Sequence, residues 1–186
     1  MLPARNPKLM QFAISLLLLA FIAACATVVD PYFEAAAKGD VRTIKSLLES
    51  GTSVNKQNEN GESALMIAAN NNEEILAQYL LRKGADVNAK DQSGFTTLMW
   101  ASAGGNAEIV NAILERGAKV NEKDNNGTTP LLAAAKKGRT SIVDILLTKG
   151  ADLNARDKDG KTALTYAKEH NYVRLTHYLE VAGAKE

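Results

Sequence analysis

The stretch DNNGTTPLLAAAKKGRTSIVDILLTKGADLNAR, residues 124–156, decides the fold of this chain. It contains two short apolar patterns with helical spacing, a glycine after each of them, and an extended tail rich in turn residues. The same pattern recurs along the chain in steps of 33 residues. Residues that keep this spacing include Gly61, Gly94, Gly127 and Gly160; Asn55, Asn88, Asn121 and Asn154; and Leu48, Leu81, Leu114 and Leu147. A fixed period kept in several registers predicts a stacked array of structural repeats.

The recurring unit has four recognisable parts. They are D-x-x-G-x-T-P-L at Asp124–Leu131, A-A-x-x-G at Ala134–Gly138, I-V-x-x-L-L at Ile142–Leu147 and G-A-D-L-N-A at Gly150–Ala155. Together they resemble the ankyrin repeat, and the resemblance covers residues 32–184. It implies an all-α fold, an ankyrin-type α-solenoid of five stacked helix-pair repeats with short β-hairpin loops. The expected repeats are residues 32–57, 58–90, 91–123, 124–156 and 157–184, within one repeat domain at 31–186.

The chain departs from the family pattern at two kinds of position. The histidine of the family's T-P-L-H motif is absent, and its register holds Met66, Met99, Leu132 and Thr165. We expect the fold to persist, because stacking supplies most of the stability of a repeat array, but the polar network between repeats must differ. In the last repeat Glu180 stands in the leucine register. A polar residue there is typical of a closing cap, so we expect the array to be complete.

Residues 1–24 do not belong to the array and have the layout of a secretory signal peptide. Arg5 and Lys8 precede an apolar run at 12–24, and small residues follow it. The alternative is a retained membrane anchor, since residues 9–29 are just long enough to cross a bilayer as a helix. We expect cleavage, because the continuous apolar core is short. Residues 25–30 would then form a tether to the array.

The site of the cut decides where the protein resides. The segment Ile22-Ala23-Ala24-Cys25 resembles the lipobox of bacterial lipoproteins, in which the cysteine is acylated. Ala24-Cys25-Ala26 also fits the A-x-A pattern of an ordinary secretory cut. Cys25 is the only cysteine and has no disulfide partner, so lipidation is the simplest use for it. By resemblance to the lipoproteins of Gram-negative bacteria, Ala26 in place of aspartate implies an exported outer-membrane lipoprotein that faces the periplasm. The ordinary cut would give a soluble periplasmic protein.

Composition and motifs argue against nucleic-acid binding and catalysis. The chain has 22 Lys and Arg against 21 Asp and Glu, with no basic stripe of the kind that nucleic acid requires. The two histidines, His170 and His177, lie together in the last repeat, where we expect them to be solvated. No phosphate loop or Ser, His and acid arrangement is present, and the Asp/Asn-rich turns lack the glutamate of a calcium loop. We expect no catalytic residues, metal or cofactor.

Binding residues follow from the resemblance, which implies contacts at hairpin tips and at outward positions of the first helix of each repeat. The positions expected to bind a partner are Phe95, Trp100, Glu62, Gln92, Thr128, Lys136, Lys137 and Lys161. Exposed aromatic residues are typical interface anchors. Phe95 could instead fold onto a neighbour, and Trp100 could instead pack between adjacent first helices. Repeat two is acidic and repeat four is basic, which would orient a partner with its acidic side toward repeat four.

These observations predict a non-catalytic protein–protein interaction module. We expect a monomeric, membrane-anchored lipoprotein adaptor that faces the periplasm, with another protein and the lipid bilayer as its partners. The alternatives are a soluble periplasmic protector or inhibitor of an enzyme, and an enzyme in its own right. The last alternative needs a convergent polar pocket, for which the sequence offers no candidate.

Overall fold

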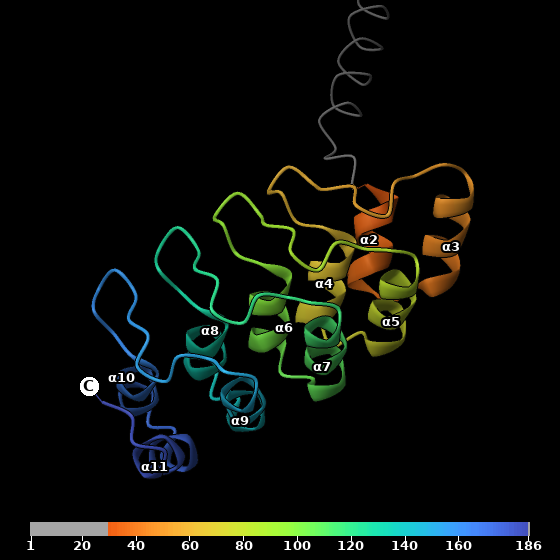
Figure 1. Cartoon of the computed structure of the whole chain (residues 1–186). Helices are drawn as coiled ribbons and strands as arrows, with labels where there is room; N and C mark the ends of the chain where they lie inside the picture. The colour runs from red at the N-terminus through yellow and green to blue at the C-terminus, as the bar shows by residue number, and fades with distance from the viewer. Residues whose placement is uncertain (1–29, 186) are drawn as a thin grey trace, which may run out of the picture. The chain divides into compact units, whose positions relative to one another are not determined.

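The computed structural model describes residues 30–185. The predicted signal peptide, Cys25 and the tether up to Val29 lie outside these residues. The described part of the chain is helical and contains no strand, in agreement with the all-α prediction (Figure 1). Its helices are α2 (Pro31–Ala37), α3 (Val41–Glu49), α4 (Ala64–Asn70), α5 (Glu74–Arg82), α6 (Thr97–Gly104), α7 (Ala107–Glu115), α8 (Pro130–Lys136), α9 (Thr140–Thr148), α10 (Ala163–Glu169) and α11 (Val173–Val181). One pair of helices lies in each predicted repeat, and the exact repeat boundaries stay a prediction.

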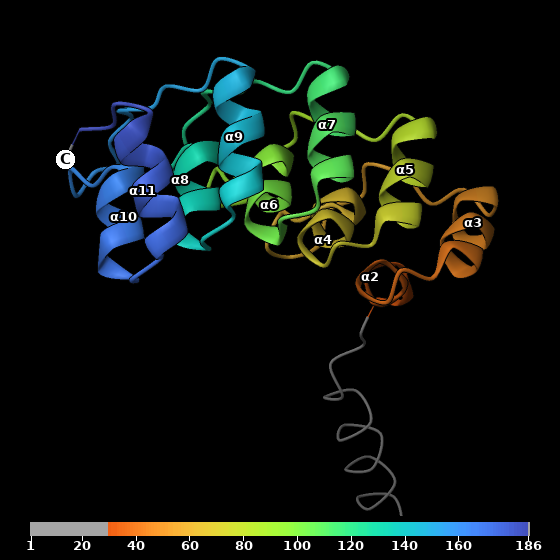
Figure 2. The ribbon, with the colours of Figure 1, turned by 90° about the horizontal axis from the view of Figure 1, so that it is seen from below.

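Within residues 32–185 the helices form two layers. Helices α4, α6, α8 and α10 pack side by side in a first layer, and α3, α5, α7, α9 and α11 follow one another in a second (Figures 1 and 2). The loops that connect successive pairs project beyond the first layer as hairpins (Figure 1). Two hairpins are each closed by a single antiparallel bridge, Gln57 to Ser63 and Lys90 to Thr96. None of the helices in the described part has the length and apolar character needed to cross a membrane.

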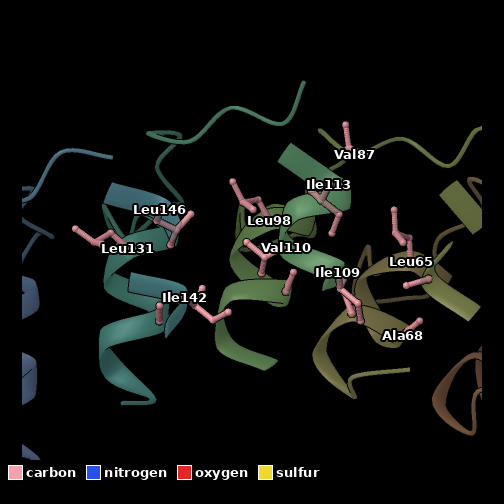
Figure 3. Packing of buried hydrophobic residues seen from close by; sticks show 14 of the residues in the cluster. Leu65, Ala68, Val87, Leu98, Ile109, Val110, Ile113, Leu131, Ile142 and Leu146 are labelled. Atoms are coloured by element: carbon pink, nitrogen blue, oxygen red, sulfur yellow. The ribbon is translucent and has the colours of Figure 1, made fainter. Parts of the chain in front are cut away.

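Packing between the layers holds these short helices together. Helices of seven to nine residues are too short to be stable alone in water, so burial must supply their stability. Leu98 of α6 lies close to Val110 and Ile113 of α7 in a continuous apolar core (Figure 3). Fully buried alanines such as Ala101 and Ala134 line the first layer. Their small side chains let neighbouring first-layer helices approach closely.

Hydroxyl residues cap the first-layer helices, as the sequence predicts. The amide of Met66 donates to Ser63 Oγ at 3.3 Å, and the amide of Met99 donates to Thr96 Oγ1 at 3.3 Å. The same two methionines return the contact, because Met66 Sδ and Met99 Sδ each accept from the amide of the capping residue at 3.4 Å. These residues occupy the register of the missing family histidine. A local reciprocal cap therefore forms at that position.

Two ladders of hydrogen bonds fix the spacing of successive hairpins. One ladder is formed by asparagines that recur every 33 residues. The Oδ1 atom of each accepts a hydrogen bond from a backbone amide of the next repeat or of the C-terminal segment, at 2.9, 3.3, 2.8 and 2.7 Å for Asn55, Asn88, Asn121 and Asn154. Nearer the tips, the amide of Asn125 donates to the carbonyl of Ser93, and the amide of Lys158 donates to the carbonyl of Asn126, both at 2.9 Å. Each hairpin is thus positioned by its neighbour, and the side chains along the tips keep a defined spacing.

Candidate functional site

A groove of about 490 Å³ lies between the hairpins and first-layer helices of repeats three and four. It brings together five of the eight residues predicted to bind a partner: Phe95, Trp100, Thr128, Lys136 and Lys137. The remaining lining residues are Asn70, Ser93, Ala103, Asp124, Asn126 and Ala133. The volume falls within the range of about 300–1,000 Å³ that is usual for ligand sites. The groove combines an aromatic side with a cationic side.

The aromatic side is held in place by one buried carboxylate. Trp100 Nε1 donates to Asp91 Oδ2 at 3.1 Å, and the ring of Phe95 meets the Trp100 ring edge to face at 5.2 Å. Asp91 Oδ1 accepts from the amides of Ser93 at 2.8 Å and Phe95 at 2.9 Å. Asp91 therefore fixes the hairpin and the indole together. Phe95 does fold onto its neighbour, yet it stays half-buried and still lines the groove.

The groove exists because repeat four has alanine where its neighbours have rings. Asp91 bonds Trp100, nine residues later, and Asp157 accepts a hydrogen bond from the hydroxyl of Tyr166, also nine residues later. In repeat four the same step leads from Asp124 to Ala133. Ala133 is buried and lines the hollow between the two aromatic repeats. Asp91 and Ala133 are not among the residues predicted to bind a partner, although the nine-residue step from hairpin acid to ring is visible in the sequence.

The cationic side consists of two adjacent lysines in different surroundings. Lys136 Nζ lies 3.8 Å from Asp157 Oδ2 and 4.6 Å from the centre of the Tyr166 ring, and it donates to Thr128 Oγ1 at 3.4 Å. These contacts hold it against repeat five. Lys137 is exposed and makes no ion pair within residues 30–185. Lys137 is therefore the cation of the groove that is available to a partner.

The Asp157–Tyr166 pair that supports Lys136 has a defined protonation state. Burial of Asp157 by itself would raise the pKa of its carboxyl. Hydrogen bonds from Tyr166 and from the Lys161 amide, with the charge of Lys136, outweigh this effect and lower the pKa below its usual value. Burial, and then the bond to Asp157, raise the pKa of the Tyr166 hydroxyl. At neutral pH the pair is thus a phenol donating to a carboxylate, which keeps the negative charge under Lys136.

The other three predicted residues lie beside the groove. Glu62 lines a smaller hollow of about 260 Å³, of which Trp100 also forms a side. Gln92 bridges hairpin tips, because its Nε2 donates to the carbonyl of Glu59 at 2.6 Å. Lys161 pairs with Glu169 at 2.8 Å in repeat five. Contact of these residues with a partner stays a prediction.

Residues 30–185 contain no cluster of three or more His, Cys, Asp or Glu side chains that could hold a metal ion. His170 stacks on the ring of Tyr172 at 5.5 Å, and its Nδ1 lies 3.0 Å from the carbonyl of Tyr166. His177 lines a separate shallow hollow on the last repeat.

Comparison with known proteins identifies the family. A family model described as ankyrin repeats, in three copies, matches residues 32–124 and 118–184, which is most of the chain. No curated protein matches the chain. The matched segments cover the stacked helix pairs and hairpins described above. The chain belongs to the ankyrin repeat family.

Proposed function

We propose that this protein is a non-catalytic interaction module that binds another protein through the groove between repeats three and four. One observation carries the proposal: residues far apart in the sequence, Phe95 and Trp100 in repeat three and Lys137 in repeat four, line a single hollow. Ankyrin repeats generally mediate binding to other proteins, in agreement with this assignment. A pre-formed aromatic side suits binding, because little side-chain entropy is lost when rings are already held in place.

Site-specific crosslinking tests this function directly. A photo-reactive amino acid placed at Lys137 should yield one discrete crosslinked protein in the native cell. The same residue placed at Lys149, the exposed C-cap of α9 in the second layer, serves as the matched control. A product at position 149 and none at position 137 would move the binding face to the second layer. No product at either position would contradict a stable partner.

We further propose that Cys25 is acylated and that the array is held at the outer membrane, facing the periplasm. The lone cysteine directly after an apolar run supports this proposal. One thioether-linked diacylglycerol would hold the protein durably, since each buried CH₂ contributes about 0.8 kcal/mol. From Cys25 to Pro31 the chain can reach at most roughly 20 Å, which would keep the repeats near the lipid surface.

Lipid labelling tests the anchor. Labelled palmitate is expected to follow the wild-type chain into the membrane fraction, and Cys25→Ser should remove both label and membrane association. Label retained by the serine variant would rule out acylation at Cys25. A wild-type chain that is unlabelled and found in the soluble periplasmic fraction would favour the alternative, a soluble protector or inhibitor of an enzyme.

A further inference from the structure

The hollow at Ala133 lies where the two neighbouring repeats each have an aromatic ring. Trp100 of α6 and Tyr166 of α10 occupy the same register on the two neighbouring first-layer helices, and each donates to the acid nine residues before it. Ala133 of α8, between them, has only a methyl group. The result is a gap that an aromatic or large aliphatic side chain from outside can fill, with the rings of Phe95 and Trp100 on one side of it.

The charged residues that line the groove determine which residue can stand next to that side chain in a bound segment. Asp124, the acid of this groove, turns its Oδ1 into its own hairpin, where it accepts from the amides of Asn126 at 2.8 Å and Thr128 at 2.6 Å. Lys136 is paired with Asp157, whose side chain is only 4% exposed, at 3.8 Å. Lys137 is exposed at the end of α8 and carries an unpaired positive charge into the groove. The charged side chains that line the groove are Lys136, Lys137 and Asp124, so cations outnumber the acid. A carboxylate beside Lys137 would be attracted, whereas an ammonium group there would be repelled.

On the proposed function that this groove binds a protein, we infer that its occupant is an acidic peptide segment with one large apolar side chain. The apolar side chain fills the gap over Ala133 against Phe95 and Trp100. A neighbouring aspartate or glutamate of the same segment pairs with Lys137. Apolar burial supplies most of the affinity, and the ion pair supplies the choice of partner, because exposed pairs contribute little by themselves.

Trp100 makes the inference directly measurable, because it is the only tryptophan of the chain. The probe is the peptide acetyl-Gly-Phe-Asp-Asp-Gly-amide, titrated into the full chain while the emission of Trp100 is followed. Two matched peptides separate the contributions: one has lysines in place of both aspartates, and one has alanine in place of phenylalanine. The acidic aromatic peptide should bind at least roughly fivefold more tightly than either of them.

Two protein variants place the peptide in the groove. Lys137→Glu should weaken the acidic peptide roughly tenfold, because charge reversal replaces an attraction by a repulsion, while Lys149→Glu should change nothing. Ala133→Tyr should abolish binding because it supplies the missing ring itself. Its hydroxyl can donate to Asp124 as that of Tyr166 does to Asp157, so the melting temperature should not fall.

The outcomes separate this inference from the proposed function. Equal or tighter binding of the lysine peptide, unchanged affinity in Lys137→Glu, or retained affinity in folded Ala133→Tyr would each overturn the acidic-segment assignment. Absence of any peptide binding would overturn it too, and crosslinking from position 137 would then show whether a protein still binds there by other contacts. If the peptide binds but no protein is crosslinked in cells, the acidic-segment assignment stands and the proposed function as a protein-binding module is contradicted.

Discussion

Replacing Ile109 with alanine is expected to lower the free energy of unfolding by about 2–5 kcal/mol. Ile109 lies on α7 in the middle of the array and is completely buried. The shortened side chain loses its transfer free energy and leaves a cavity that short helices, packed on both sides, cannot close. Because each repeat of such an array is stabilised by its neighbours, a defect in the middle weakens the contacts on both sides of it.

The matched control is Ile75→Ala on α5, one repeat earlier. Ile75 is 75% exposed, so the same chemical change should alter stability by less than about 0.5 kcal/mol. Urea unfolding followed by circular dichroism measures both variants, and the emission of Trp100 reports on repeat three in the same experiment. Similar losses in the two variants would contradict the two-layer packing described here.

Gly104→Ala is expected to destabilise the chain by about 2–3 kcal/mol, although alanine is the better helix former. Gly104 is the one glycine of the chain without a positive φ, so the reason is not backbone conformation. A Cβ atom at this position would lie 2.5 Å from the carbonyl oxygen of Ala69 and 2.9 Å from that of Asn70, both in α4. These are backbone atoms and cannot move aside without shifting one helix against the other. The helix-propensity gain of about 1 kcal/mol is too small to offset such a clash.

Gly84→Ala is the control, because there the backbone conformation and not a steric clash favours glycine. Gly84 has a φ of +84° and would place its Cβ atom in open space, with no atom within 4 Å. It should therefore cost only the roughly 1–2 kcal/mol of a left-handed residue with a side chain. Thermal unfolding of both variants, with Trp100 emission as a local readout, compares the two. A stabilised Gly104→Ala chain would show that α4 and α6 do not approach as closely as described.

Much of the fold can be predicted from spacing alone. The repeated glycines, leucines and capping hydroxyls are local requirements of each unit, so residues such as Thr96 and Gly127 identify a helix start and a hairpin turn without knowledge of any neighbour. Five of the predicted binding residues also meet in one groove, because a regular stack brings equivalent positions of adjacent repeats together. The replacement of the family histidine predicts a change in polar contacts. It does not predict the methionine sulfur caps, since a sulfur acceptor has no distinct sequence pattern.

By itself, then, the amino-acid sequence determined the repeat, its period and its family. Only the tertiary structure decided that Asp91 holds Trp100, that Gln92 bridges hairpin tips, and that Ala133 leaves a gap between two rings. It also decided that Gly104 has to be small, although Asn71 and Lys137 occupy the same register in the adjacent repeats. The physical reason is that a period records what every repeat shares. A groove arises where adjacent repeats differ, from distances between side chains that no single unit contains.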